Sequence, residues 1–219
     1  MKTLTKEMQT NITPAMALEL LKDGNQRFVN NLKVNRNLLQ QANETSDGQH
    51  PFAVILSCID SRTSAELIFD QGLGDVFSVR IAGNIINEDI LGSMEFGCKV
   101  AGAKIIVVLG HTKCGAVKGV CDHVEMGNLT ALLTKIRPAV DDETTTTENR
   151  NSNNGEFVEN VATINVKRTV KAITERSPIL KEMIENGQIG IVGGTHDITT
   201  GQVTFFPETI NVTSELRNE

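Results

Sequence analysis

The sequence contains neither tryptophan nor tyrosine among its 219 residues. The absence of tyrosine excludes a phenolic hydroxyl from any catalytic mechanism, and the absence of tryptophan removes the indole chromophore. No apolar run approaches the roughly 20 residues that a membrane-spanning helix needs. The first residues, Met1 to Met8, lack the apolar segment of a signal peptide. We therefore expect a cytoplasmic protein with no membrane partner.

The formal net charge is −6, so the chain lacks the overall positive charge that is typical of nucleic-acid-binding proteins. It also lacks a Gly-Lys-Thr or Gly-Lys-Ser tripeptide, and no glycine-rich fingerprint follows the first predicted strand. We therefore expect no nucleic-acid partner and no nucleotide cofactor. In a reducing compartment, the four cysteines favour free thiols or metal ligands over disulfides.

Apolar runs predict strands near 52–57, 75–80, 104–110 and 188–194, and a last edge strand near 202–206. Helical segments are predicted between them, near 63–70, 88–101, 115–124, 128–137, 156–174 and 178–186. This alternation predicts a single α/β domain over 1–219, with a mainly parallel central sheet and helices on both faces. The turn Thr199-Thr200-Gly201 predicts that the last strand is an antiparallel edge.

Two further segments stand outside this alternation. The segment 13–33 begins with a capping threonine and a proline, which predicts a helical arm. Its apolar stripe is expected to be buried on its own domain or on a neighbouring subunit, and comprises Leu18, Leu21, Phe28 and Leu32. Polar residues 40–49 predict a connecting loop, and the threonine- and asparagine-rich segment 141–155 predicts a flexible surface loop that does not pack.

Soft metal ligands follow two of the predicted strands directly. Cys58 comes after the apolar run 52–56, and His111 and Cys114 come after the apolar run 105–109. Because the carboxyl ends of parallel strands meet at one edge of a sheet, we expect these three side chains to share a crevice. Cysteine and histidine are preferred zinc ligands, so the pattern predicts a Zn²⁺ site.

Asp60 and Arg62 lie next to the first predicted ligand. Asp60 has two plausible roles, as a fourth zinc ligand in a closed state or as the partner of Arg62 that accepts a hydrogen bond from zinc-bound water. The planar guanidinium of Arg62 grips a carboxylate with two hydrogen bonds, which favours the second role. On its own, the same pair could be an ordinary ion pair.

Three motifs resemble those of the β-class carbonic anhydrases: Ser-Cys-Ile-Asp-Ser-Arg at 57–62, Arg-Ile-Ala-Gly-Asn at 80–84 and Gly-His-Thr-Lys-Cys-Gly-Ala-Val at 110–117. The similarity runs from about Thr13 to about Val203. The resemblance implies a zinc-dependent, reversible hydration of carbon dioxide to bicarbonate and a proton. It also implies a homodimer or tetramer in which the N-terminal helix lies across the partner subunit, which would account for the apolar stripe.

The resemblance implies Cys58, His111 and Cys114 as zinc ligands and Asp60 with Arg62 as a catalytic pair. It also implies substrate-binding positions, as in the plant-like subclass of the family, at Gln49 and Phe77, and Gly115 could offer a backbone N–H. Ala82 and Phe77 would form a small apolar wall that suits a substrate without charge. Ile55 and Ser57 replace the tryptophan and glycine that form an inhibitory bicarbonate pocket in the other subclass. Phe96 departs from the plant-like pattern, because it occupies a position that usually holds tyrosine.

Zinc lowers the pKa of bound water toward 7, which provides hydroxide near neutral pH. Two thiolate ligands donate more negative charge than imidazoles would, so we expect activity that increases toward alkaline pH. Asp60 would be held by Arg62 and would orient the hydroxide. The proton carrier is left open among His50, His123, His196 and buffer.

Other functions are compatible with the same residues. The zinc site could hydrolyse carbonyl sulfide or carbon disulfide, or it could be a closed structural site. The protein could also be a catalytically silent zinc scaffold or a bicarbonate-binding regulator. Cys98 and Cys121 are interpreted as packing residues because no other ligand lies near them in sequence, and Gln49 could be a loop residue without a role.

Overall fold

The computed structural model describes residues 3–211 of the chain. Residues 1–2 and 212–219, which the predicted single domain includes, lie outside the described residues. A five-stranded sheet has the order β2-β1-β3-β4-β5. The strands are β1 (Ala53–Ser57), β2 (Val76–Arg80), β3 (Ile105–His111), β4 (Gly190–His196) and β5 (Val203–Phe205). All neighbouring pairs are parallel except β4–β5, which confirms the predicted antiparallel edge.

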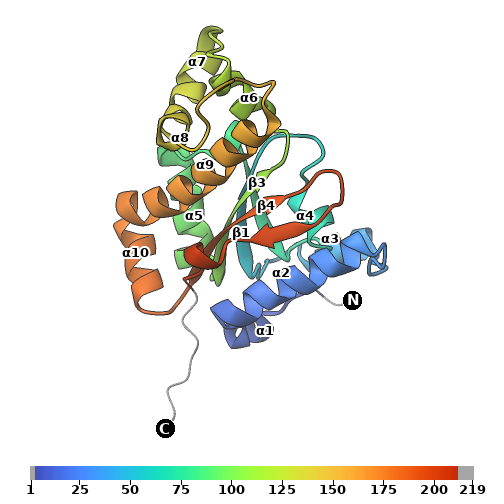
Figure 1. The fold of residues 1–219 in the computed structure, drawn as a ribbon. Helices are drawn as coiled ribbons and strands as arrows, with labels where there is room; N and C mark the ends of the chain where they lie inside the picture. The colour runs from blue at the N-terminus through green and yellow to red at the C-terminus, as the bar shows by residue number, and fades with distance from the viewer. Residues whose placement is uncertain (1–2, 212–219) are drawn as a thin grey trace.

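Helices cover both faces of the sheet, which explains why every residue of β1 and β3 is buried. One face packs against α5 (Glu88–Glu95), α9 (Gly155–Arg176) and α10 (Pro178–Glu185). The opposite face packs against α2 (Pro14–Val29) and α4 (Ala65–Ile68). Figure 1 shows α9 and α10 on one side of the sheet and α2 on the other. Within 3–211, no helix combines the length and hydropathy needed to cross a bilayer.

A third hydrophobic cluster lies where the parallel strands end. It is formed with α9 by α6 (Gly115–Cys121), α7 (Gly127–Thr134) and α8 (Arg137–Asp142), which Figure 1 shows grouped beyond one end of the sheet. Ser57 is paired with Leu109, so β1 and β3 reach this end side by side. The register therefore brings the residues that follow β1 next to those at the end of β3.

The N-terminal segment packs on its own chain. It forms α1 (Lys6–Asn11), α2 and α3 (Leu38–Glu44), and Thr13 caps α2 as its sequence predicts. Leu18 and Leu21 are buried against the sheet, and a Cβ added to Gly24 would lie 1.8 Å from the carbonyl oxygen of Phe69. No partner subunit is needed to bury these two leucines, whereas Leu32 of the same stripe is exposed. Packing of the arm on a partner stays a prediction.

Some helix boundaries differ from the predicted ones. The predicted loop at 40–49 is wrong in its first half, because α3 begins at Leu38 with Asn37 as its cap, and Gln41 is buried. The predicted helix 88–101 consists of α5 and a turn of π-helix, η2 (Phe96–Val100). The predicted helix 128–137 is divided between α7 and α8. Two short 3₁₀ segments complete the elements within residues 3–211, η1 (Ala82–Asn84) and η3 (Pro207–Thr209).

The segment 141–155 is organised around a buried carboxylate, so the expectation that its composition could not pack is wrong. Glu143 accepts hydrogen bonds from the backbone N–H of Thr146 at 3.1 Å and from the Arg150 guanidinium at 2.7 Å. The same guanidinium lies over the Phe157 ring, 4.6 Å from its centre. The predicted flexibility of this segment stays a prediction.

Candidate metal centre

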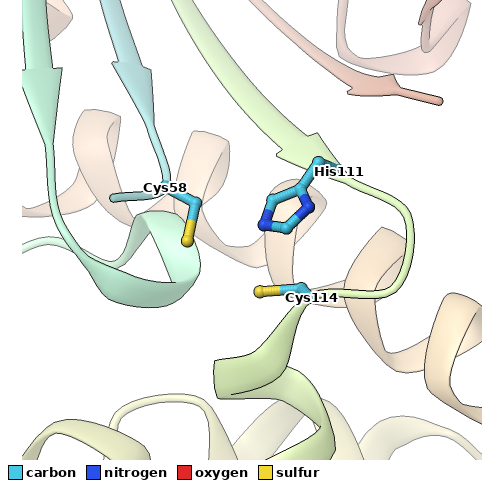
Figure 2. Close-up of side chains that lie close together, drawn as sticks. All are labelled: Cys58, His111 and Cys114. Carbon is cyan, nitrogen blue, oxygen red and sulfur yellow. The ribbon is translucent and has the colours of Figure 1, made fainter. Parts of the chain in front are cut away.

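The three predicted metal ligands meet at the end of the sheet. Cys58 follows β1, His111 ends β3 and Cys114 caps α6, and one ligand atom from each lies within 4.8 Å of the others. All three side chains are buried, with exposed fractions of 4%, 1% and 2%. Figure 2 shows the two sulfur atoms and the imidazole directed toward a common point. The pairing of β1 with β3 thus produces the predicted cluster.

The imidazole of His111 presents one nitrogen to this point. Its Nδ1 lies 2.9 Å from the carbonyl oxygen of Thr112, and because a carbonyl can only accept, Nδ1 carries the proton. The other nitrogen, Nε2, is buried and has no hydrogen-bond partner among residues 3–211. A neutral imidazole with its lone pair on Nε2 is the form that binds a metal.

Backbone N–H groups donate hydrogen bonds to both sulfur atoms. The N–H of Gly83 donates to the Cys58 sulfur at 3.4 Å. The N–H groups of Ala116 and Val117, in the first turn of α6, donate to the Cys114 sulfur. Such donors stabilise thiolates, which are the forms that ligate metals. Two thiolates and one imidazole, with a fourth position left for water, match the donor set of a catalytic Zn²⁺ site.

Without metal, the two thiols share one proton. The hydrogen bond from Cys114 lowers the pKa of Cys58, and the N–H of Gly83 acts in the same direction. The same hydrogen bond and burial raise the pKa of Cys114. The contact between the two sulfur atoms thus favours ionisation of Cys58 before Cys114.

This shared proton predicts a stability maximum near pH 8.5 for the contribution of the thiol pair. An unfolded cysteine has a pKa of about 8.5. Below that value, and down to the lowered pKa of Cys58, the folded state binds one proton fewer, so stability increases with pH. Above it the folded state retains the Cys114 proton that the unfolded chain releases, so stability decreases with pH.

Urea unfolding of the reduced, chelator-treated protein from pH 6 to 10 measures this contribution as the difference between wild type and the double variant Cys58→Ser/Cys114→Ser. The slope below the maximum is at most about 1.4 kcal/mol per pH unit for one proton. Thiolate absorbance can be followed in parallel, because the sequence has no tyrosine or tryptophan background. A difference that does not change with pH would contradict the shared proton.

Asp60 is paired with Arg62 at the edge of the ligand cluster. The Arg62 guanidinium donates to both carboxylate oxygens, at 2.9 and 2.6 Å, and the Arg62 backbone N–H donates at 2.9 Å. These hydrogen bonds hold the pKa of Asp60 far below its ordinary value. The Oδ2 atom lies 4.0 Å from Nε2 of His111. Of the two roles predicted for Asp60, this arrangement corresponds to pairing with Arg62.

Arg80 and Thr63 support this loop, which sequence reasoning did not identify. Arg80 donates to the carbonyl oxygens of Cys58 at 3.1 Å and Asp60 at 2.7 Å. The hydroxyl of Thr63 donates to the carbonyl oxygen of Asp60 at 2.9 Å. Arg80 is the first residue of the motif Arg-Ile-Ala-Gly-Asn at 80–84, and this was the only feature of the sequence that could have indicated its role.

Gln49 and Phe77 are not gathered around the ligands of their own chain. Gln49 is exposed in the segment between α3 and β1. Phe77 is paired with Val54, four residues before Cys58, which places it roughly 13 Å along the strand from that ligand. Its ring contacts that of Phe96 edge-to-face, with centres 6.3 Å apart. Their roles in substrate binding stay predictions.

Ala82 and Gly115 lie close to the ligands. Ala82 precedes Gly83, whose N–H reaches the Cys58 sulfur, and it is partly exposed. Gly115 directly follows Cys114 and faces open space, because a Cβ built on it meets no atom within 4 Å. The roles of both residues in substrate binding stay predictions.

The other candidate side chains differ in burial. His196 is paired with His111 across β3 and β4 and is buried, and its burial lowers its pKa to about 4. His123 is exposed beside Arg137, and His50 is partly buried. Cys98 and Cys121 are buried in hydrophobic clusters, and none of the four cysteines forms a disulfide. Neither of these two cysteines belongs to the ligand cluster among the described residues.

The sequence is similar to those of known carbonic anhydrases. A family model described as carbonic anhydrase matches residues 53–203. Carbonic anhydrase 2 of Mycobacterium tuberculosis is 34% identical over 218 residues, which cover 94% of this chain and 99% of that protein. A carbonic anhydrase of Mycolicibacterium smegmatis is 36% identical over 195 residues, which cover 88% and 93% of the two chains.

Solved structures lead to the same family. A β-carbonic anhydrase of Aspergillus fumigatus has a TM-score of 0.68 at 27% identity, covering 88% of this chain and 90% of that one. A structure described among two tetrameric β-carbonic anhydrases of Sordaria macrospora has a TM-score of 0.66 at 24% identity, covering 74% and 83%. Because the family match spans more than half of the sequence and includes all three clustered ligands, the chain belongs to the β-carbonic anhydrases, a family of lyases.

Proposed function

We propose that the protein catalyses the reversible hydration of carbon dioxide to bicarbonate and a proton, with Zn²⁺ held by Cys58, His111 and Cys114. One observation carries the proposal. Three buried ligand atoms converge within 4.8 Å, and the carboxylate of the Asp60–Arg62 pair lies 4.0 Å from the ligand nitrogen of His111. Family membership supports the same reaction.

When bound, zinc would supply a water molecule acidic enough to serve as the nucleophile near neutral pH. Asp60 would contribute orientation rather than proton storage, because its lowered pKa keeps the carboxylate ionised throughout the working pH range. Arg62 occupies both carboxylate oxygens and fixes the plane of the group. The remaining lone pairs of Oδ2, the oxygen nearest His111, would accept a hydrogen bond from the nucleophile.

A small, uncharged substrate suits the surroundings of the site. Ile59, directly after the first ligand, is exposed, and Ala82 adds another apolar side chain. We propose that the backbone N–H of Gly115 stabilises the oxygen that gains charge. Gln49 and Phe77 would contribute only if an assembly of more than one chain brought them to a metal centre.

We propose a homodimer or tetramer. Within 3–211, the outer edge of β2 has no partner strand. Large apolar side chains are exposed on segments that adjoin this strand, including Leu67, Phe96 and Ile59. The Sordaria macrospora enzymes are described as tetrameric. Light scattering after size-exclusion chromatography would test the assembly, and a monomer at micromolar concentration would contradict it.

We also propose a cytoplasmic location. The absence of disulfides among the four cysteines is consistent with a reducing compartment.

Stopped-flow measurement tests the reaction against its alternatives. Hydration of carbon dioxide should far exceed hydrolysis of carbonyl sulfide at equal concentrations. The reverse order would identify a hydrolase of sulfur analogues on the same fold. Zinc-loaded protein with neither activity would support a silent scaffold or a bicarbonate-binding regulator.

A further inference from the structure

Two short backbone segments position the ligand atoms, and both are held by side chains of α9. The first segment is the turn from His111 to Cys114, which carries a ligand at each end. The second is Gly83 in η1, whose N–H donates to the sulfur of Cys58. Glu159 contacts the first segment and Asn165 contacts the second.

Glu159 holds the turn at its strained residue. Lys113 has a φ of 57°, in the left-handed region that residues other than glycine seldom adopt. Its N–H donates to Oε1 of Glu159 at 2.8 Å. The preceding residue, Thr112, is held from β4, because its N–H donates to the carbonyl oxygen of His196 at 3.0 Å. The turn is thus hydrogen-bonded to β4 of the sheet through Thr112 and to α9 through Lys113.

Asn165 holds Gly83 from the interior. It is buried, and its Nδ2 donates to the Gly83 carbonyl oxygen at 2.9 Å. Gly83 has a φ of 67°, and a Cβ at this position would lie 2.4 Å from Cδ1 of Ile136. The approach of Ile136 therefore leaves no room for a side chain at Gly83, and the hydrogen bond from Asn165 holds the Gly83 carbonyl. That N–H reaches the Cys58 sulfur at 3.4 Å.

We propose that α9 is a positioning element for the metal centre, in which Glu159 and Asn165 set the geometry of the three ligands and slow the release of zinc. The two residues are six positions apart, about 9 Å along the helix axis. The hydrogen bonds of both go to backbone groups of the ligand-bearing segments, so both are positioning residues. The inference rests on the proposed zinc site.

Zinc release to a chromogenic chelator and the absorption spectrum of the Co²⁺-substituted protein test the proposal. Glu159→Ala and Asn165→Leu should each weaken zinc retention by about 10–100-fold, as losses of outer-shell partners do. Both should alter the thiolate-to-cobalt bands, because the ligand angles change. Glu159→Gln should restore zinc retention to within a few-fold of wild type, because its amide oxygen still accepts from Lys113.

The matched control is Glu156→Ala, an exposed carboxylate in the first turn of α9. It should leave zinc release and the cobalt spectrum unchanged. If Asn165→Leu fails to fold, Asn165→Ala replaces it, because alanine removes the donor to the Gly83 carbonyl oxygen without adding a larger side chain. Wild-type zinc release and an unaltered cobalt spectrum in the Glu159→Ala and Asn165 variants would overturn the proposal.

Neither measurement uses carbon dioxide, so this test and the test of the proposed function can fail separately. If zinc release is slow and depends on Glu159 and Asn165, but the protein has no hydration activity, only the proposed function is contradicted. If the protein has full hydration activity, but its metal retention does not depend on either residue, only the positioning role is contradicted.

Discussion

Asp60→Asn is expected to reduce carbon dioxide hydration by roughly 10²–10³-fold, the range for the loss of one positioned hydrogen-bonding group in an active site. The substitution is isosteric, but one carboxylate oxygen becomes an NH₂ group. In the orientation that places this group at Oδ2, it would face the Arg62 nitrogen that now donates there at 2.6 Å, so two donors would oppose each other. The amide also lacks the negative charge that makes Asp60 a strong acceptor. Zinc content should remain at one per chain, because Asp60 is not part of the ligand cluster.

A matched control is Asp142→Asn, which removes the same charge from an exposed ion pair with Arg168 outside the metal centre. Its turnover should equal that of wild type, because exposed pairs contribute little. Turnover within about threefold of wild type in Asp60→Asn would exclude a direct role for the carboxylate. Loss of zinc in that variant would instead identify Asp60 as a ligand.

Cys114→Ser is expected to lose zinc and activity together. A serine hydroxyl is a weaker zinc ligand than a thiolate, and the loss should exceed the 10–100-fold reduction in affinity caused by losing an outer-shell partner. Zinc per chain, measured by elemental analysis after dialysis against a weak chelator, should fall to near zero. Circular dichroism of the variant would show whether the fold is retained.

Cys121→Ser provides the comparison at the other end of α6. Cys121 is also buried and belongs to the same hydrophobic cluster, but it lies outside the ligand cluster. Burying a hydroxyl in place of this thiol should lower the thermal midpoint, while zinc remains at one per chain. Retention of zinc by Cys114→Ser, or loss of zinc by Cys121→Ser, would contradict the assignment of the ligands.

The sheet could be predicted because its strands are buried on both faces and therefore appear as continuous apolar runs. The run 105–109 lies within β3, and the run 52–56 overlaps β1. Because these two strands pair in parallel with Ser57 opposite Leu109, ligands that are distant in sequence meet at one end. The predicted ligand cluster followed from this topology.

The apolar periodicity of the sequence could not reveal every N-terminal helix or the surface on which each helix packs. α3 was missed because its sequence, Leu-Leu-Gln-Gln-Ala-Asn-Glu, is mostly polar and lacks an apolar repeat, and it depends on the cap at Asn37. The stripe of α2 was identified, but a stripe does not specify its partner surface. Leu18 and Leu21 pack on their own sheet, a choice that depends on the close approach of Gly24 to Phe69.

The contacts that support the site could not be predicted, because they join residues far apart in sequence. Asn165 reaches Gly83 across 82 positions, and Lys113 reaches Glu159 across 46. In the sequence, both side chains belong to a predicted helix and carry no motif. Likewise, the sequence did not indicate that Phe77 lies beside Phe96 rather than beside the ligands of its own chain.

Zinc is titrated into metal-free, reduced protein, and the initial rate of carbon dioxide hydration is measured at each step. This experiment tests whether activity depends on the bound metal. We expect the rate to increase in proportion to bound zinc, to level off at one ion per chain and to be higher at alkaline than at acidic pH. Stoichiometric zinc binding without hydration at any pH would contradict the proposed reaction, and hydration that did not depend on zinc would contradict the role of the Cys58, His111 and Cys114 centre.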